Sequence, residues 1–240
     1  MKKRLKIDGF LVFCIFGLLV GAENIFLRNN QGGYISNILM NTFGMVLFIL
    51  GEIIRISARG YKSEHLGNGQ ALIKTGPYFF VRNPMYLGIL LIALGVALIL
   101  LKWWAAGFFT ALFIIRYKFV ISQEEKKLEK IFSQEYMDYK NEVPRMLPSI
   151  KIFAVKYISE CLPLKISWVK KEIGAINTLL LVMFFLSIWP RIKRTGISFY
   201  SEELTEWAIL TSCFICMIFY FCRQTKKTMK NGSSQIKNTL

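Results

Sequence analysis

Long apolar runs separated by shorter polar segments are the dominant pattern in this chain. The runs occupy residues 10–27, 35–56, 85–101, 105–121, 173–189 and 204–222. Each is close to the roughly 20 residues that a helix needs to cross the hydrocarbon core of a bilayer. The pattern therefore predicts an all-α, polytopic membrane helix bundle of about six transmembrane helices, in contact with the lipid bilayer.

The segments on either side of the fourth run predict how the neighbouring helices are arranged. Only Lys102, Trp103 and Trp104 separate the third run from the fourth, so we expect an antiparallel hairpin of helices. After residue 121, apolar residues continue at helical spacing with charges on the opposite side. We expect this amphipathic stretch to extend the fourth helix out of the lipid and to end near Pro144, which cannot continue a helix.

Composition and charge refine this picture. The chain is 54% hydrophobic and has a mean hydropathy of +0.41, which is too apolar for an ordinary soluble domain. Its net charge of +16 does not lie on one continuous face, so we expect no nucleic-acid partner. Most of the 31 basic residues lie in the two tails and in the connections after the second and fourth runs. By the positive-inside rule, we expect an integral protein of the cytoplasmic (inner) membrane with both termini and these connections in the cytoplasm.

The cysteines and the one histidine give no metal-binding pattern. The five cysteines lie mostly within apolar runs, and Cys213 and Cys216 form a C-x-x-C that lacks further Cys or His partners. We therefore expect neither a metal site nor a disulfide. His65 lies in a polar connection over residues 55–75, where we expect a surface residue. A general base is the alternative, because imidazole titrates near neutral pH.

The segment before the third run, residues 76–88, reads GPYFFVRNPMYLG. Pro77 and Pro84 lack a backbone N–H, and each disfavours helix at the preceding residue, so we expect residues 76–84 to be non-helical. Arg82 stands between them, and its guanidinium can bind a carboxylate or a phosphate at two points. Composition alone leaves two interpretations open, a ligand-binding loop and an interfacial turn with an aromatic belt.

A second segment, residues 124–148, reads EEKKLEKIFSQEYMDYKNEVPRMLP. The two segments, in this order, resemble the motifs of the isoprenylcysteine carboxyl methyltransferase and phospholipid methyltransferase superfamily of integral membrane enzymes. The first is similar to the pattern G-x-Y-x-x-x-R-H-P-x-Y-x-G, and the second to the paired glutamates and Tyr-x-x-Tyr of that family. The chain departs from the family pattern at Asn83, where the usual residue is histidine.

The resemblance implies an S-adenosylmethionine cofactor held by cytoplasmic loops and helix ends. The implied cofactor-binding residues are Gly76, Tyr78, Arg82, Asn83, Pro84, Tyr86, Gly88, Glu124 and Glu125. Arg82 and Glu125 are also the candidate catalytic residues. Adjacent residues on a helix point about 100° apart, so we expect one of the two glutamates to contact ligand and the other to belong to the scaffold.

The resemblance also implies methyl transfer to an amphiphilic acceptor, which can be a carboxylate, a thiol or an amine. Two alternatives stay open: an NADPH-dependent membrane reductase with a similar loop, and a non-catalytic membrane scaffold. We divide the chain into an N-terminal helix pair (1–56), a methyltransferase-like core (57–148), and a basic amphipathic segment with two further helices and a polar tail (149–240). The sequence leaves the oligomeric state open.

Overall fold

The protein is built from helices. The computed structural model describes residues 17, 21–28, 34–66, 71–147, 162–195, 212 and 223. The helices are α2 (Glu23–Phe26), α3 (Tyr34–His65), α4 (Pro77–Phe80), α5 (Pro84–Leu100), α6 (Trp103–Glu142) and α8 (Ile166–Thr195). No strand forms among these described residues, so the all-α prediction is confirmed.

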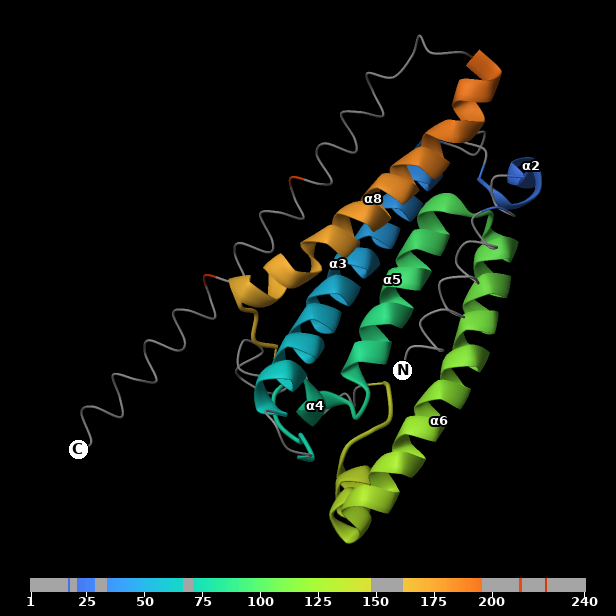
Figure 1. Cartoon of the computed structure of the whole chain (residues 1–240). Coiled ribbons are helices and arrows are strands. Elements are labelled where there is room, and N and C mark those ends of the chain that lie inside the picture. Colours follow the sequence, from blue (N-terminus) through green and yellow to red (C-terminus); the bar gives the residue numbers. More distant parts are fainter. Residues whose placement is uncertain are drawn as a thin grey trace.

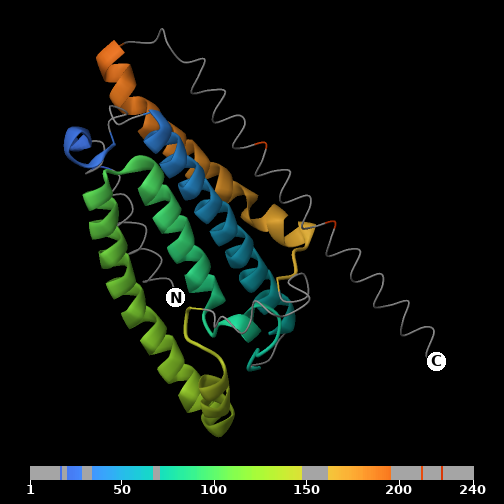
Figure 2. The same cartoon turned by 180° about the vertical axis from the view of Figure 1, so that it is seen from behind.

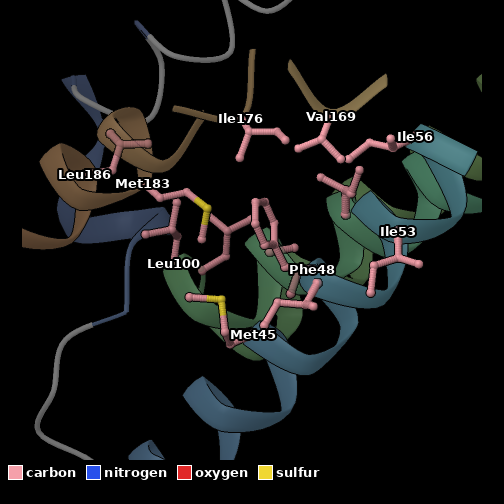
Figure 3. Close-up of a cluster of buried hydrophobic side chains, with 14 of the residues drawn as sticks. Met45, Phe48, Ile53, Ile56, Leu100, Val169, Ile176, Met183 and Leu186 are labelled. Carbon is pink, nitrogen blue, oxygen red and sulfur yellow. The ribbon is translucent and has the colours of Figure 1, made fainter. Parts of the chain in front are cut away.

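The long helices pack side by side in an elongated bundle. In Figure 1 and in the reverse view of Figure 2, α5 lies between α3 and α6, and α8 packs along α3. Helices α5 and α6 run antiparallel, which confirms the predicted hairpin. Figure 3 shows the apolar core where α3, α5 and α8 meet. Its fully buried members include Phe48 and Ile56 of α3 and Met183 of α8.

Glycines bring α3 and α5 into backbone contact. A Cβ atom added at Gly51 would lie 2.6 Å from the carbonyl oxygen of Gly88, and one added at Gly95 would lie 2.4 Å from that of Gly44. Small residues allow such close approach, and any larger side chain at these points would push the helices apart. Gly88, predicted to bind cofactor, therefore has a packing role in this interface.

Charged side chains fasten α8 to α3. Arg55 lies 2.8 Å from Glu52 on the same helix and 3.6 Å from Glu172 of α8. Arg59 lies 2.9 Å from the other carboxylate oxygen of Glu172. Glu52 and Glu172 are both buried, and buried carboxylates are stable only when they are paired in this way. The cluster therefore fixes where α8 lies along α3.

Two expectations about helix ends are wrong. The second apolar run was expected to end at residue 56, but α3 continues to His65, so this residue lies on a helix end and stacks on Tyr61 with ring centroids 3.8 Å apart. Residues 76–84 were expected to be non-helical, but α4 forms one helical turn within them. A proline is tolerated at the first helical position, because the N–H that it lacks has no partner in a helix anyway.

Two helices are long and apolar enough to cross a membrane, Leu39–His65 and Trp103–Glu142, and α5 is a shorter apolar helix. The fourth apolar run continues as a helix beyond residue 121, as predicted, up to a kink at Ser133, and a further helical stretch ends at Glu142. The predicted total of about six spans is not confirmed. Most of the first run and of the last run lies outside the described residues, as do the basic segment over 149–161 and all five cysteines.

Candidate active site

A cavity of about 270 Å³ lies where the two sequence motifs meet. Four elements enclose it: the end of α3, residues 71–73, the α4–α5 hinge and the outer part of α6. Its charged and polar lining residues are Lys62, Tyr78, Arg82, Asn83, Tyr86, Glu124, Tyr136 and Tyr139. The rest of the lining is mostly apolar, so the cavity offers both charges and a hydrophobic wall.

A kink in α6 brings the second motif back toward the first. Ser133 has φ 44° and ψ −116°, which no regular helix contains, and it is the position where α6 changes direction. Beyond it the chain turns back toward the α4–α5 hinge (Figure 1). Tyr136, Tyr139 and Val143 become buried, with Leu72 packed against them. The reversal therefore builds the cavity wall from a helix that would otherwise point away.

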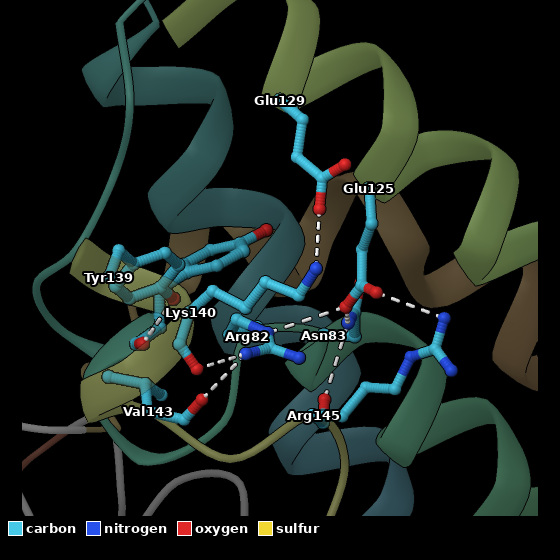
Figure 4. A network of polar contacts seen from close by, with 9 residues as sticks. Arg82, Asn83, Glu125, Glu129, Tyr139, Lys140, Val143 and Arg145 are labelled. Atoms are coloured by element: carbon cyan, nitrogen blue, oxygen red, sulfur yellow. Dashed lines mark hydrogen bonds and ion pairs between the residues drawn. The ribbon is translucent and has the colours of Figure 1, made fainter. Parts of the chain in front are cut away.

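Arg82 ties the hinge to the end of α6 (Figure 4). Its Nη1 donates hydrogen bonds to the carbonyl oxygens of Lys140, at 2.5 Å, and Val143, at 3.1 Å. Its backbone N–H donates to the carbonyl of Pro144 at 2.9 Å. The side chain is only 9% exposed. Arg82 lines the cavity as predicted, but its donors also hold the surrounding chain in place.

Glu125 is the centre of a buried polar network (Figure 4). Its Oε1 accepts a hydrogen bond from Asn83 Nδ2 at 3.0 Å and lies 3.4 Å from Arg82 Nε. Its Oε2 lies 2.9 Å from Arg145 Nη2. Asn83 Nδ2 also donates to the carbonyl of Arg145 at 3.3 Å. Glu125 is absent from the cavity lining, so the geometry gives it a scaffold position rather than a ligand-facing one.

Glu124 faces the cavity instead. Its Oε2 accepts a hydrogen bond from the Tyr86 hydroxyl at 2.7 Å, and its Oε1 lies 3.5 Å from Lys62 Nζ. The rings of Tyr86 and Tyr117 pack in a T-shaped arrangement, with centroids 5.5 Å apart, which restrains the position of the hydroxyl. The two neighbouring glutamates thus point in different directions, as helical geometry predicts.

The cavity tyrosines are neutral hydrogen-bond donors. Tyr139 donates to the carbonyl of Tyr78 at 2.6 Å, and Tyr78 donates to that of Ala58 at 3.5 Å. Burial raises the pKa of Tyr78, Tyr136 and Tyr139 above the usual value of about 10. At physiological pH all three therefore keep their protons and do not act as bases.

The remaining predicted residues divide between lining and support. Pro84 lines the cavity, whereas Gly76 does not. Gly76 has φ +61°, which favours glycine, and an added Cβ would lie 2.8 Å from the ring of Tyr61. Its role is therefore to turn the chain in front of α4. Sequence reasoning did not predict Lys62 as a site residue, because it lies outside both motifs and no local pattern marks it.

Comparison with known proteins places the first motif, and the second as far as residue 135, in one family. The phospholipid methyltransferase family model matches residues 39–135. Protein-S-isoprenylcysteine O-methyltransferase of Saccharomyces cerevisiae is 36% identical over 123 residues, which are 47% of this chain and 50% of that protein. Protein-S-isoprenylcysteine O-methyltransferase B of Arabidopsis thaliana is 30% identical over 138 residues, 54% of this chain and 68% of that protein. The Mus musculus relative of the same name is 29% identical over 121 residues, 47% of this chain and 42% of that protein. No solved structure matches the chain significantly.

The described residues form a helical bundle with two apolar helices of membrane-spanning length and a cavity to which both motifs contribute. The chain belongs to the isoprenylcysteine and phospholipid methyltransferase superfamily. It spans about half the length of the relatives it matches, from 42% of the mouse protein to 68% of the Arabidopsis protein.

Proposed function

We propose that this protein is an integral membrane methyltransferase that uses S-adenosylmethionine to methylate the carboxylate of an amphiphilic acceptor such as a prenylated cysteine. The observation that carries the proposal is the cavity, in which Tyr78, Arg82 and Tyr86 of the first motif meet Glu124 of the second. The names of the similar proteins, all isoprenylcysteine O-methyltransferases, support this acceptor class.

The cavity residues fit the cofactor. S-adenosylmethionine presents a carboxylate, an ammonium, ribose hydroxyls and an adenine face, so its site needs a cation, an anion and an apolar or aromatic slot. Lys62 and Arg82 supply positive charge, Glu124 supplies negative charge, and Leu128 and Phe132 belong to the apolar wall. When bound, the cofactor supplies a methyl group already activated by the sulfonium.

The residues of the chain then have to align the acceptor with the methyl group, exclude water from the cavity and leave the acceptor in its ionised form. Alignment of nucleophile and methyl carbon, together with exclusion of water, supplies most of the acceleration in such a transfer. A carboxylate acceptor is already ionised at neutral pH and needs no base. An amine would first have to lose a proton, and the cavity tyrosines, whose pKa is raised by burial, do not take one. Among the described lining residues Glu124 is the carboxylate that could take this proton, whereas a carboxylate acceptor needs no base at all.

We also propose the full membrane arrangement, with six spans, both termini in the cytoplasm of the cell and the cavity at the cytoplasmic face of the inner membrane. The distribution of Lys and Arg between the apolar runs supports it. On α6, an apolar stripe that includes Phe108, Leu112, Ile115 and Phe119 is exposed, as a lipid-facing surface would be. Because the same helix carries Glu124, a lipid-linked acceptor in the bilayer lies close to the cavity.

The test is methyl transfer by the purified protein in lipid nanodiscs. With a tritiated methyl donor and N-acetyl-S-farnesylcysteine, we expect a product whose label is released as methanol by alkali, which identifies a methyl ester. The matched control is the same acceptor with its carboxylate converted to an amide, which should stay unlabelled. Binding of NADPH with no binding of S-adenosylmethionine would instead support the alternative of a membrane reductase and would contradict this proposal.

Asn83 stands where the family pattern usually has histidine, and substitutions at this position test what the difference does. Its amide donates to both Glu125 and the carbonyl of Arg145, which is a positioning role. Asn83→His should leave turnover within about tenfold, or 1.4 kcal/mol of barrier, because an imidazole N–H can replace one donation and the transfer needs no proton relay. Asn83→Leu removes the amide donations to Glu125 and to the Arg145 carbonyl and should destabilise the protein by about 1–3 kcal/mol. A large gain in turnover on restoring histidine, with a new pH dependence, would show that the natural protein has lost catalytic power.

A further inference from the structure

The cavity contains an ion pair that the fold does not need. Lys62, in the last turn of α3, lies 3.5 Å from Glu124 of α6, which is longer than the 2.7–3.2 Å of an N–H···O hydrogen bond. The side chains are 43% and 33% exposed, so water reaches both. Surface pairs of this kind contribute little to stability. Lys62 and Glu124 can therefore each exchange the other for a charged group of a ligand with little loss of folding free energy.

Arg82, the other cation that lines the cavity, is less free to exchange its partners for a ligand. Arg82 is 9% exposed, its Nη1 donates to two carbonyl oxygens, and its Nε faces Glu125. An arginine that left these partners would break the contact between the hinge and the end of α6. Of the charged side chains that line the cavity, Lys62 and Glu124 are the two that can turn toward a ligand without loss of structure.

We propose that Lys62 and Glu124 together bind the amino-acid end of S-adenosylmethionine. This inference rests on the proposed function, because it assumes that cofactor. An α-amino acid carries an ammonium and a carboxylate on one carbon, and the cavity presents a carboxylate and an ammonium side by side in the complementary order. Glu124 accepts hydrogen bonds from the cofactor ammonium, and Lys62 pairs with the cofactor carboxylate.

The surroundings of Glu124 favour this exchange. The Tyr86 hydroxyl holds Oε2 at 2.7 Å, which fixes the carboxylate plane while Oε1 stays turned to Lys62. Each carboxylate oxygen has two lone pairs, so Oε1 can accept from an ammonium without releasing Tyr86. When the ammonium takes the place of Nζ, the lysine is left beside the cofactor carboxylate. Lys62 is thereby a binding residue contributed by α3, outside both motifs.

The test compares two ligands that differ in this end only. S-adenosylhomocysteine carries the amino-acid group, and 5′-methylthioadenosine lacks it. Titration calorimetry of the full chain in nanodiscs should show that Lys62→Met lowers the affinity for S-adenosylhomocysteine at least about tenfold, as expected for the loss of a charge-assisted contact. The affinity for 5′-methylthioadenosine should not change. Glu124→Gln should give the same selective loss, and Lys62→Arg should retain most of the affinity.

Lys74→Met is the matched control. Lys74 also pairs with a glutamate, Glu135, at 3.0 Å and is similarly exposed, but it lies outside the cavity lining. It should leave both affinities unchanged. Equal losses for both ligands in Lys62→Met, or no loss for either, would overturn the role of Lys62 while the wild type still binds cofactor. A wild-type protein that binds neither ligand would instead overturn the proposed function.

Discussion

Glu125→Ala is expected to lower the free energy of unfolding by about 3–5 kcal/mol, the range for removing one partner of a buried charge cluster. The carboxylate lies 3.4 Å from Arg82 and 2.9 Å from Arg145 and is 8% exposed, so its loss leaves positive charge uncompensated. Asn83 also loses an acceptor. Thermal unfolding followed by tryptophan fluorescence in nanodiscs measures the effect. Glu125→Gln should be intermediate, because an amide oxygen still accepts from Asn83 but carries no charge.

Glu129→Ala is the control for this result. Glu129 lies one helical turn further along α6 and pairs with Lys140 at 2.5 Å, but both side chains are partly exposed. We expect a loss of about 1 kcal/mol or less, since water screens such a pair. Similar small losses in both alanine variants would show that Glu125 lies on a solvated helix face and that the buried network does not form.

Arg82→Lys is expected to reduce kcat/KM for methyl transfer by about a hundredfold or more. A guanidinium reaches two carbonyl oxygens and Glu125 at once from a planar group, whereas an ammonium is a compact point charge on a flexible stem. The end of α6 would then shift relative to the hinge, and a displacement of about 1 Å is enough to cost a hundredfold. The same variant should also unfold at lower temperature, because the contact is structural.

Arg59→Lys offers the same chemical change at a site that should tolerate it. Arg59 is 61% exposed, pairs with Glu172 of α8 and is absent from the cavity lining. We expect kcat/KM within about twofold of the wild type, because a lysine here keeps the positive charge and Arg55 also lies near Glu172. If Arg82→Lys also kept wild-type kcat/KM, the assignment of Arg82 to the site would be wrong.

Local patterns predicted the parts of this fold that local contacts determine. The α5–α6 hairpin and the continuation of α6 follow from a three-residue link and an amphipathic stripe. The extension of α3 to His65 was missed because its support comes from about 100 residues away, where Lys165 and Trp168 contact Glu64. Tertiary contacts override local propensity at such a helix end.

The site was predictable in its residues and less so in their roles. Both motifs contribute to one cavity, but the sequence could not say which glutamate faces it. That depends on the direction of α6 and on the reversal at Ser133, a residue whose left-handed conformation no pattern in the sequence marks. Lys62 was missed for a related reason, since only the packing of α3 and α6 on either side of α5 brings it to the cavity wall.

The glycine contacts between α3 and α5 restrict how the molecule can change shape. A slide of α3 along α5 would move Gly51 and Gly88 off each other, and a larger side chain would then have to enter a contact that admits only a hydrogen atom. The end of α3 with Lys62 and the start of α5 at Asn83 therefore keep a fixed separation. We expect any motion that admits a ligand to occur in the outer part of α6, near the kink at Ser133.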